Sequence, residues 1–179
     1  MRFTFNPMNG YSLVHMCAQY ETLDILKFLV EYFKQCYRQL LTQQNVDVQN
    51  GVAPGNILSK EQIDQLIKGS INLWVNQMTP KDEGWTALHL ACKVNLLDKG
   101  SNEIFKLILS LGADPYMRNK HGASLMHKAA KDDNTSLITF LRDKLNFSVS
   151  EKDFFENTPL HYSCFENTIY SSYWLIGFG

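Results

Sequence analysis

Apolar residues recur along the chain in three groups that share one internal spacing. In each group they occupy positions i, i+1, i+3 and i+4, which line one side of an α-helix. The groups are Ile25, Leu26, Phe28 and Leu29; Ile104, Phe105, Leu107 and Ile108; and Leu137, Ile138, Phe140 and Leu141. We therefore predict three amphipathic helices that each bury one face.

A second pattern, which contains a histidine, precedes each of these helices and occurs a fourth time further along the chain. Its copies are GYSLVHMC at 10–17, GWTALHLA at 84–91, GASLMHKA at 122–129 and ENTPLHYS at 156–163. Within each copy of this motif, a Ser or Thr lies three residues before the histidine. The pairs are Ser12 and His15, Thr86 and His89, Ser124 and His127, and Thr158 and His161. The motif histidines His89, His127 and His161 are 38 and 34 residues apart, so the chain contains an internal repeat.

These segments resemble the T-P-L-H-x-A signature of the ankyrin repeat, whose length is about 33 residues. The resemblance implies an all-α fold, a solenoid of stacked helix-turn-helix units joined by β-turn loops. We expect about four repeats, near 8–36, 82–114, 120–147 and 153–179, with five extra residues within 94–102 of the second.

The fourth repeat departs from the pattern of the others. Glu156 replaces the turn glycine, so we expect a turn without a positive φ or a local bulge. Ser171 and Ser172 occupy slots that are apolar in the other repeats, which weakens the prediction for the last helix pair.

A long insertion separates the first repeat from the second, because His15 and His89 are 74 residues apart. We assign it to 37–80, where nothing resembles the histidine motif; a degenerate repeat that has lost its signature is the alternative. No Gly or Pro interrupts the chain from Thr22 to about Gln44, which predicts a long helix. Ser59 followed by Gln62 predicts a capping box and a further helix, with its apolar residues on one side: Ile63, Leu66, Ile67 and Ile71.

The ends of such a stack need a cover, because each repeat exposes an apolar face where a neighbour is missing. We expect the residues before the first motif to provide one, through Phe3, Phe5 and Met8. At the other end we expect solvent exposure of four residues, Trp174, Leu175, Ile176 and Phe178. We therefore expect the sequence to be a fragment of a longer protein.

The histidines and cysteines are the residues that could suggest catalysis or metal binding. The resemblance implies that the hydroxyl of each motif caps a helix and contacts the imidazole, which bonds to the neighbouring turn, so all four motif histidines are expected to be structural. Cys17, Cys92 and Cys164 occupy small apolar slots of the first helices, so we expect core packing and no metal site. Only the Cys36 thiol is expected to be exposed. We expect no cofactor and no active site.

Composition excludes few functions but favours a reduced, globular module. Apolar residues make up 45% of the 179 residues. The 17 basic residues balance 18 acidic ones, so the chain has no net positive charge that would attract nucleic acid. The four cysteines lack the short spacings of a disulfide framework. We expect a cytoplasmic location and no direct membrane contact.

The remaining candidate chemistry lies on the concave face that ankyrin repeats build from turn tips and first helices. More of these positions carry an aromatic side chain than a purely solvated surface would need, and this is typical of residues that anchor a binding partner. The expected partner-binding residues are Tyr11, Gln19, Tyr20, Glu83, Trp85, Lys93, His121, Lys131, Asp132, Phe155 and Phe165. For Trp85 the alternative is a core position under the insertion.

The leading hypothesis is therefore a non-catalytic module that binds a protein or peptide on its concave face. A second hypothesis comes from residues 145–164, which look similar to the repeat region of ankyrin-bearing DHHC palmitoyltransferases. It implies a cytosolic substrate-recruiting domain whose chemistry lies elsewhere, because this chain contains no Asp-His-His-Cys. A scaffold subunit of a large assembly is the third.

Overall fold

The computed structural model describes residues 11–52, 55–93 and 103–178. The expected N-terminal cap (Phe3, Phe5 and Met8) and the five extra residues within 94–102 lie outside these residues. Over the described ranges the fold is all-helical, and an isolated bridge between Met78 and Thr86 is the sole β-type pairing.

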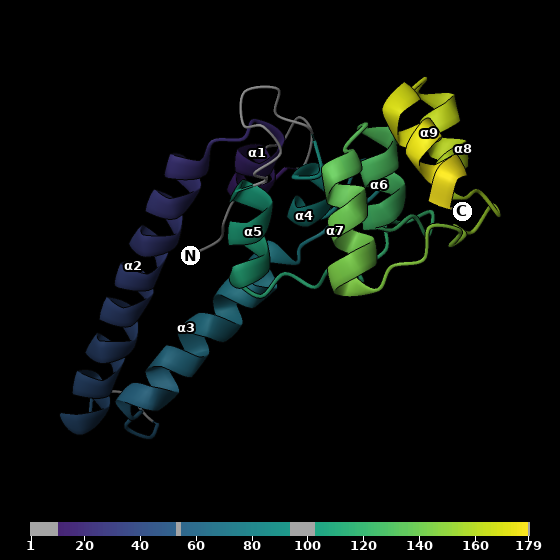
Figure 1. The fold of residues 1–179 in the computed structure, drawn as a ribbon. Coiled ribbons are helices and arrows are strands. Elements are labelled where there is room, and N and C mark those ends of the chain that lie inside the picture. The colour runs from purple at the N-terminus through teal and green to yellow at the C-terminus, as the bar shows by residue number, and fades with distance from the viewer. Residues whose placement is uncertain (1–10, 53–54, 94–102, 179) are drawn as a thin grey trace.

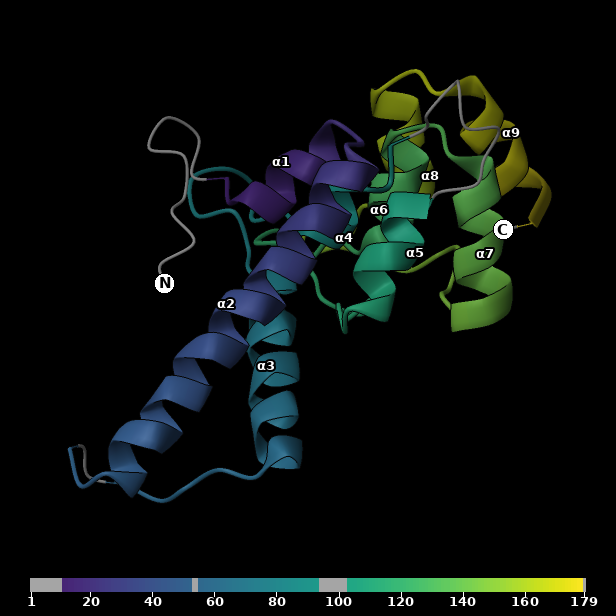
Figure 2. The same ribbon diagram turned by 90° about the vertical axis from the view of Figure 1, so that its left-hand side faces the viewer.

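The helices form an inner and an outer layer (Figures 1 and 2). The inner helices are short: α1 (Leu13–Gln19), α4 (Ala87–Leu90), α6 (Leu125–Lys131) and α8 (Pro159–Phe165). Each is followed by an outer helix: α2 (Leu23–Gln49), α5 (Glu103–Ser110), α7 (Thr135–Leu145) and α9 (Ile169–Phe178). The inner helices pack in sequence order, α1 on α4, α4 on α6 and α6 on α8.

The predicted motif explains where the inner helices begin. Ser12, Thr86, Ser124 and Thr158 are the N-cap residues, and each forms a reciprocal capping box with the histidine three residues later. The hydroxyl satisfies a backbone N–H that has no partner within the helix, and the imidazole accepts from the N-cap backbone. The motif therefore determines the start of every inner helix.

Left-handed backbone conformations shape the turns before the inner helices. Gly84 and Gly122 have φ values of 79° and 81°, as a turn glycine permits. Glu156 has φ 66°, so the expectation that this turn avoids a positive φ is wrong. Asp153 compensates, because its carboxylate accepts backbone hydrogen bonds from Phe155 at 2.8 Å and from Asn157 at 2.9 Å.

The predicted insertion folds as a helical hairpin that projects from the stack (Figure 1). Its first arm is the extension of α2 to Gln49, five residues beyond the expected end near Gln44, and its second arm is α3 (Lys60–Val75). The Ser59 capping box is present as predicted. Ile63, Ile67 and Ile71 are buried, whereas Leu66 is 45% exposed and so does not share their side.

Side-chain amides hold the hairpin at both of its ends. At the tip, Asn45 clamps the backbone of Leu58 with two 2.8 Å hydrogen bonds, one donated and one accepted. At the base, Asn72 and Asn76 donate to the Gly112 carbonyl at 2.8 and 3.0 Å. The hairpin is therefore fixed to the turn that follows α5.

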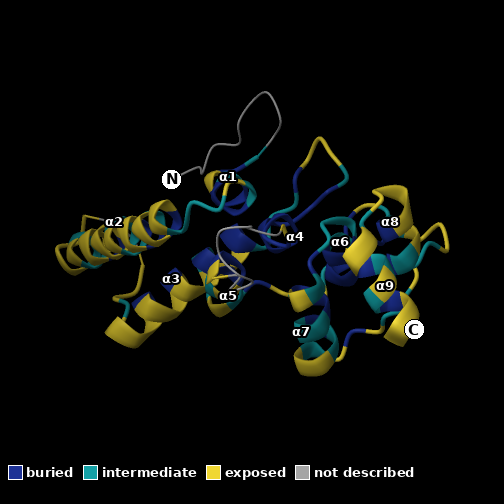
Figure 3. Cartoon of the chain, turned by 45° about the horizontal axis from the view of Figure 1, so that its top comes forward, coloured by how far each residue is buried: buried dark blue, intermediate teal, exposed yellow. Residues whose placement is uncertain are grey.

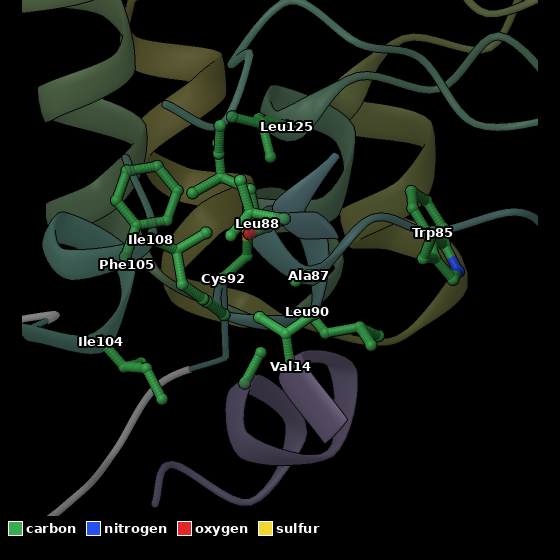
Figure 4. Packing of buried hydrophobic residues seen from close by; sticks show 14 of the residues in the cluster. Val14, Trp85, Ala87, Leu88, Leu90, Cys92, Ile104, Phe105, Ile108 and Leu125 are labelled. Carbon is green, nitrogen blue, oxygen red and sulfur yellow. Dashed lines mark hydrogen bonds between the residues drawn. The ribbon is translucent and has the colours of Figure 1, made fainter. Parts of the chain in front are cut away.

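One apolar core runs between the two layers (Figure 3). At its centre, Val14 of α1, Leu88 of α4 and Leu125 of α6 come together with Phe105 and Ile108 of α5 (Figure 4). All five are nearly inaccessible to solvent.

In α5 and α7 the apolar groups that the sequence placed on outer helices build the interface with the inner layer. In α2 the prediction holds only in part: Leu26 is buried and Leu29 half-buried, whereas Ile25 and Phe28 are 54% and 66% exposed, so the expectation that these two residues lie on the buried face is wrong.

The last helix differs from its prediction at two of four residues. Ile176 and Phe178 are 68% and 57% exposed, as expected. Leu175 is buried and Trp174 is half-buried, because the helix turns them toward α7 and the Arg142 guanidinium lies 4.8 Å from the Trp174 ring centre.

Candidate interaction surface on the inner helices

The motif histidines link consecutive helix pairs of the stack. The His15 ring contacts the Ser12 hydroxyl at 2.7 Å through Nδ1 and donates from Nε2 to the Gln77 carbonyl at 2.9 Å. His127 repeats this arrangement with Ser124 at 3.0 Å and the Asn157 carbonyl at 3.0 Å. In both rings, each of the two nitrogens is therefore engaged in a hydrogen bond within the protein.

Burial keeps these imidazoles neutral. It lowers the pKa of His15 to about 4 and that of His89 to about 3, with the nearby charge of Lys128 adding to the effect at His89. Burial also lowers the pKa of His127. Within the described residues no partner is present for His89 Nε2. His161 is exposed, unlike the other three, but it keeps the motif contact, because Thr158 Oγ1 lies 2.9 Å from its Nδ1.

Charged residues from three successive helix pairs meet on the inner layer. Lys131 of α6 lies 3.3 Å from the Glu166 carboxylate after α8 and 4.0 Å from the Glu83 carboxylate in the turn before α4. One turn earlier in α6, Lys128 pairs with Asp132 at 2.6 Å. We call these five residues the ionic strip; it contains the predicted residues Glu83, Lys131 and Asp132.

Trp85 lies beneath this strip and is not the exposed anchor that we expected. Its side chain is only 6% exposed. The Lys128 ammonium lies 5.8 Å from its ring centre and the His89 ring 5.0 Å from it. Figure 4 shows the indole at the edge of the core, away from Phe105 and Ile108. Lys128 therefore lies over the indole, and the core position that was the alternative is the one observed.

Three other predicted aromatic residues are exposed. Tyr20, Phe155 and Phe165 are 67%, 67% and 76% exposed. The Phe155 ring lies 5.7 Å from the predicted His121. We call these three residues the aromatic anchors.

The remaining predicted site residues are half-buried or exposed and are not members of the ionic strip. Tyr11 is half-buried beside His15, with ring centres 5.9 Å apart, and burial raises its pKa. Gln19 is half-buried and Lys93 is exposed.

Sequence reasoning missed Lys128 and Phe154 as members of this surface. Lys128 carried a signal, because it follows its histidine where the other copies have Met16, Leu90 and Tyr162. Phe154 is 73% exposed and lies against Gly122, where an added Cβ would clash with its ring. Nothing in the motif indicated that contact.

The cysteines follow the prediction in part. Cys17 and Cys92 are buried, and burial raises the pKa of both thiols. Cys164 is exposed, so its expected core packing is wrong, and Cys36 is half-buried rather than open. No group of three or more His, Cys, Asp or Glu side chains suited to a metal occurs among the described residues. Over the same ranges no helix has the length and hydropathy needed to cross a bilayer.

Comparison with known proteins agrees with this architecture. Residues 96–176 match the model of a family described as ankyrin repeats in three copies. The Notch-regulated ankyrin repeat-containing protein of Xenopus tropicalis is 30% identical over 104 residues, which cover 58% of this chain and 84% of that protein. The chain belongs to the ankyrin repeat family. The human protein of the same name is 29% identical over 102 residues, or 57% of this chain and 82% of that protein.

Another such relative comes from Danio rerio, where Notch-regulated ankyrin repeat-containing protein A is 30% identical over 100 residues. This match covers 56% of this chain and 82% of that protein. These ankyrin-repeat proteins give no support to the palmitoyltransferase resemblance. Membership in the family indicates, in general terms, a protein-binding role.

Proposed function

We propose that this chain is a non-catalytic module that binds a protein or peptide partner across its inner helices. The observation that carries the proposal is the exposure of the aromatic anchors at the inner helices, with Tyr20 directly after α1, Phe155 in the turn before α8 and Phe165 at its end. Exposed aromatic side chains on ordered backbone bury large areas at little entropic cost when a partner binds. We infer a cytoplasmic module of about four repeats, with the hairpin of α2 and α3 inserted after the first.

The backbone that presents the anchors supports rigid binding. Phe155 lies in a turn held by the Asp153 carboxylate, and Phe165 ends α8. An interface on ordered elements loses little conformational freedom, so more of its contact energy appears as affinity.

The ionic strip supplies orientation. Its carboxylates and ammonium groups are partly exposed and paired, so a partner can exchange these pairs for its own charges. Such exchange affects specificity and association rate more than affinity. In this proposal Trp85 supports the Lys128 side chain and does not contact the partner directly.

The test compares matched variants of the whole chain. Phe155→Asp with Phe165→Asp is the inner-face variant, and Phe28→Asp with Leu73→Asp is the control, since Phe28 of α2 and Leu73 of the hairpin arm α3 are similarly exposed and lie away from the inner helices. Partner capture from lysate is quantified by mass spectrometry. The inner-face variant should lose specific partners with its unfolding midpoint unchanged; loss in the control alone would refute the proposal.

A further inference from the structure

A hollow of about 320 Å³ lies at the base of the hairpin, where α2 and α3 meet the end of α5 (Figure 1). Its floor is apolar, because Ile67 and Ile71 of α3 are each only 4% exposed and Leu111, directly after α5, is half-buried. Ligand sites in proteins generally offer about 300–1,000 Å³ and have mostly apolar walls. The hollow is at the small end of this range, so it suits one or two side chains of a peptide.

Positively charged side chains from both arms of the hairpin surround this floor. Lys34 and Arg38 come from α2 and Lys68 comes from α3, whereas Asp64 is the one carboxylate among the described residues that line the hollow. Arg38 pairs with Asp64 at 2.8 Å, and Lys34 pairs at 2.7 Å with Glu31, which lies outside the hollow. Over the described ranges the Lys68 ammonium has neither an ion pair nor a hydrogen bond. Three cations face two carboxylates, so the charge of Lys68 is unbalanced.

The fold does not require a positive charge at Lys68. A cation beside the end of a helix is usually explained by the carbonyl groups that the helix leaves unpaired there. At the end of α5, however, the carbonyls of residues 107–109 already accept hydrogen bonds from the backbone N–H groups of residues 111–113. The Asn72 and Asn76 amides hold the hairpin to this turn. The Lys68 ammonium therefore stays available for a charged group of another molecule.

We propose that this hollow is a second binding site, independent of the inner helices, which takes an acidic side chain of a peptide together with the apolar side chain next to it. The apolar side chain rests on Ile67 and Ile71, where it leaves water. The carboxylate pairs with Lys68, and this pairing is stronger over an apolar floor than in open water because the local dielectric constant is lower.

The position of the hollow favours a peptide carboxylate over a free phosphate. Phosphate groups are commonly bound by the N–H groups at the start of a helix. The residues that line the hollow instead lie within α2 and α3 and at the end of α5. A free phosphate would also leave the apolar floor uncovered, whereas an acidic side chain beside an apolar one uses both features of the hollow.

NMR titration of the whole chain with the acetylated and amidated peptide SLELES tests the proposal. Backbone amide signals of residues 67–71 and 110–112 should shift, with a dissociation constant of about 0.1–1 mM, as expected for a contact of this size. The peptide SLQLQS lacks the carboxylates and SSESES lacks the apolar side chains. Each should bind about fivefold more weakly, because it offers only one half of the recognised pair.

Three variants at exposed residues of α3 separate this site from general charge attraction. Lys68→Met keeps an unbranched side chain but removes the charge, so it should weaken binding of SLELES by about fivefold. Asp64→Asn removes the carboxylate that pairs with Arg38, so it should strengthen binding by about threefold. Lys60→Met, at a lysine of α3 outside the hollow, is the control and should leave the dissociation constant unchanged.

Four results would overturn the proposal. The first is the absence of shifts at residues 67–71 with about 5 mM peptide. The second is an equal loss of binding in Lys68→Met and Lys60→Met, because it indicates attraction to the hairpin as a whole. The third is an equal response of the same signals to inorganic phosphate alone, which indicates a general anion site. The fourth is a set of shifts confined to α6 and α8, which assigns the peptide to the inner helices.

Discussion

Acidification should destabilise this protein through its buried motif histidines. His15 and His89 have pKa values of about 4 and about 3 in the folded chain, against 6.5 when unfolded. Because both folded values lie below the unfolded one, the unfolded state binds more protons as the pH falls below 6.5. The stability that these two residues provide is present above that pH and is lost as the pH falls toward the folded values.

The linkage relation gives the size of the effect. From about pH 7 to about pH 5, each histidine that stays neutral when folded but ionises when unfolded costs about 2 kcal/mol. His15 and His89 together therefore cost about 4 kcal/mol, and His127, whose pKa is also lowered, adds to this. This is a large part of the roughly 5–15 kcal/mol by which domains are stable. The pKa of Asp153 is lowered from 3.8 in the folded chain, so the stability that this carboxylate provides is lost only below about pH 4, outside the range from pH 7 to pH 5.

Urea unfolding across this pH range, in wild-type and His89→Gln chains, measures the effect. His89→Gln should lower stability near neutral pH by about 1–3 kcal/mol, because the Thr86 hydroxyl loses its partner. Averaged from about pH 7 to about pH 5, its dependence on pH should be shallower than that of the wild type by about 1 kcal/mol per pH unit. Equal slopes for wild type and His89→Gln would refute the buried, neutral assignment.

Two other substitutions test specific contacts. Trp85→Ala should lower the free energy of unfolding by about 3 kcal/mol, because it removes a buried indole and leaves a cavity below Lys128; denaturant titration measures this, and an unchanged midpoint would put the ring in solvent. Asn45→Ala should cost about 1–2 kcal/mol locally and speed hydrogen exchange of the Leu58 amide, since that N–H loses its acceptor at the hairpin tip; unaltered exchange at this amide would show that the clamp is dispensable.

Much of the fold could be predicted because its determinants are local. A hydroxyl and a histidine three residues apart define the start of each inner helix, and grouped apolar residues predict three of the outer helices, α2, α5 and α7. The α3 helix also had a local signal in Ser59 and Gln62. Each of these features depends on residues within about one or two turns of each other.

The candidate surface was predictable only in part, because its contacts are between repeats. The burial of Trp85 depends on Lys128, 43 positions away, whose side chain lies over the indole. The pairing of Lys131 with both Glu83 and Glu166 depends on the spacing of three helix pairs. Neither contact can be recognised from one copy of the motif. Comparing the copies position by position therefore identified the helices, but it did not show which aromatic side chains stay exposed.

The most direct test of the proposed function is hydrogen exchange of the whole chain with and without a partner obtained by capture. The account predicts that the partner slows exchange in α6, α8 and the turn at 153–158, where Phe155 and Phe165 lie, and leaves the hairpin of α2 and α3 unchanged. Slowing confined to the hairpin, with the inner helices unaffected, would contradict it.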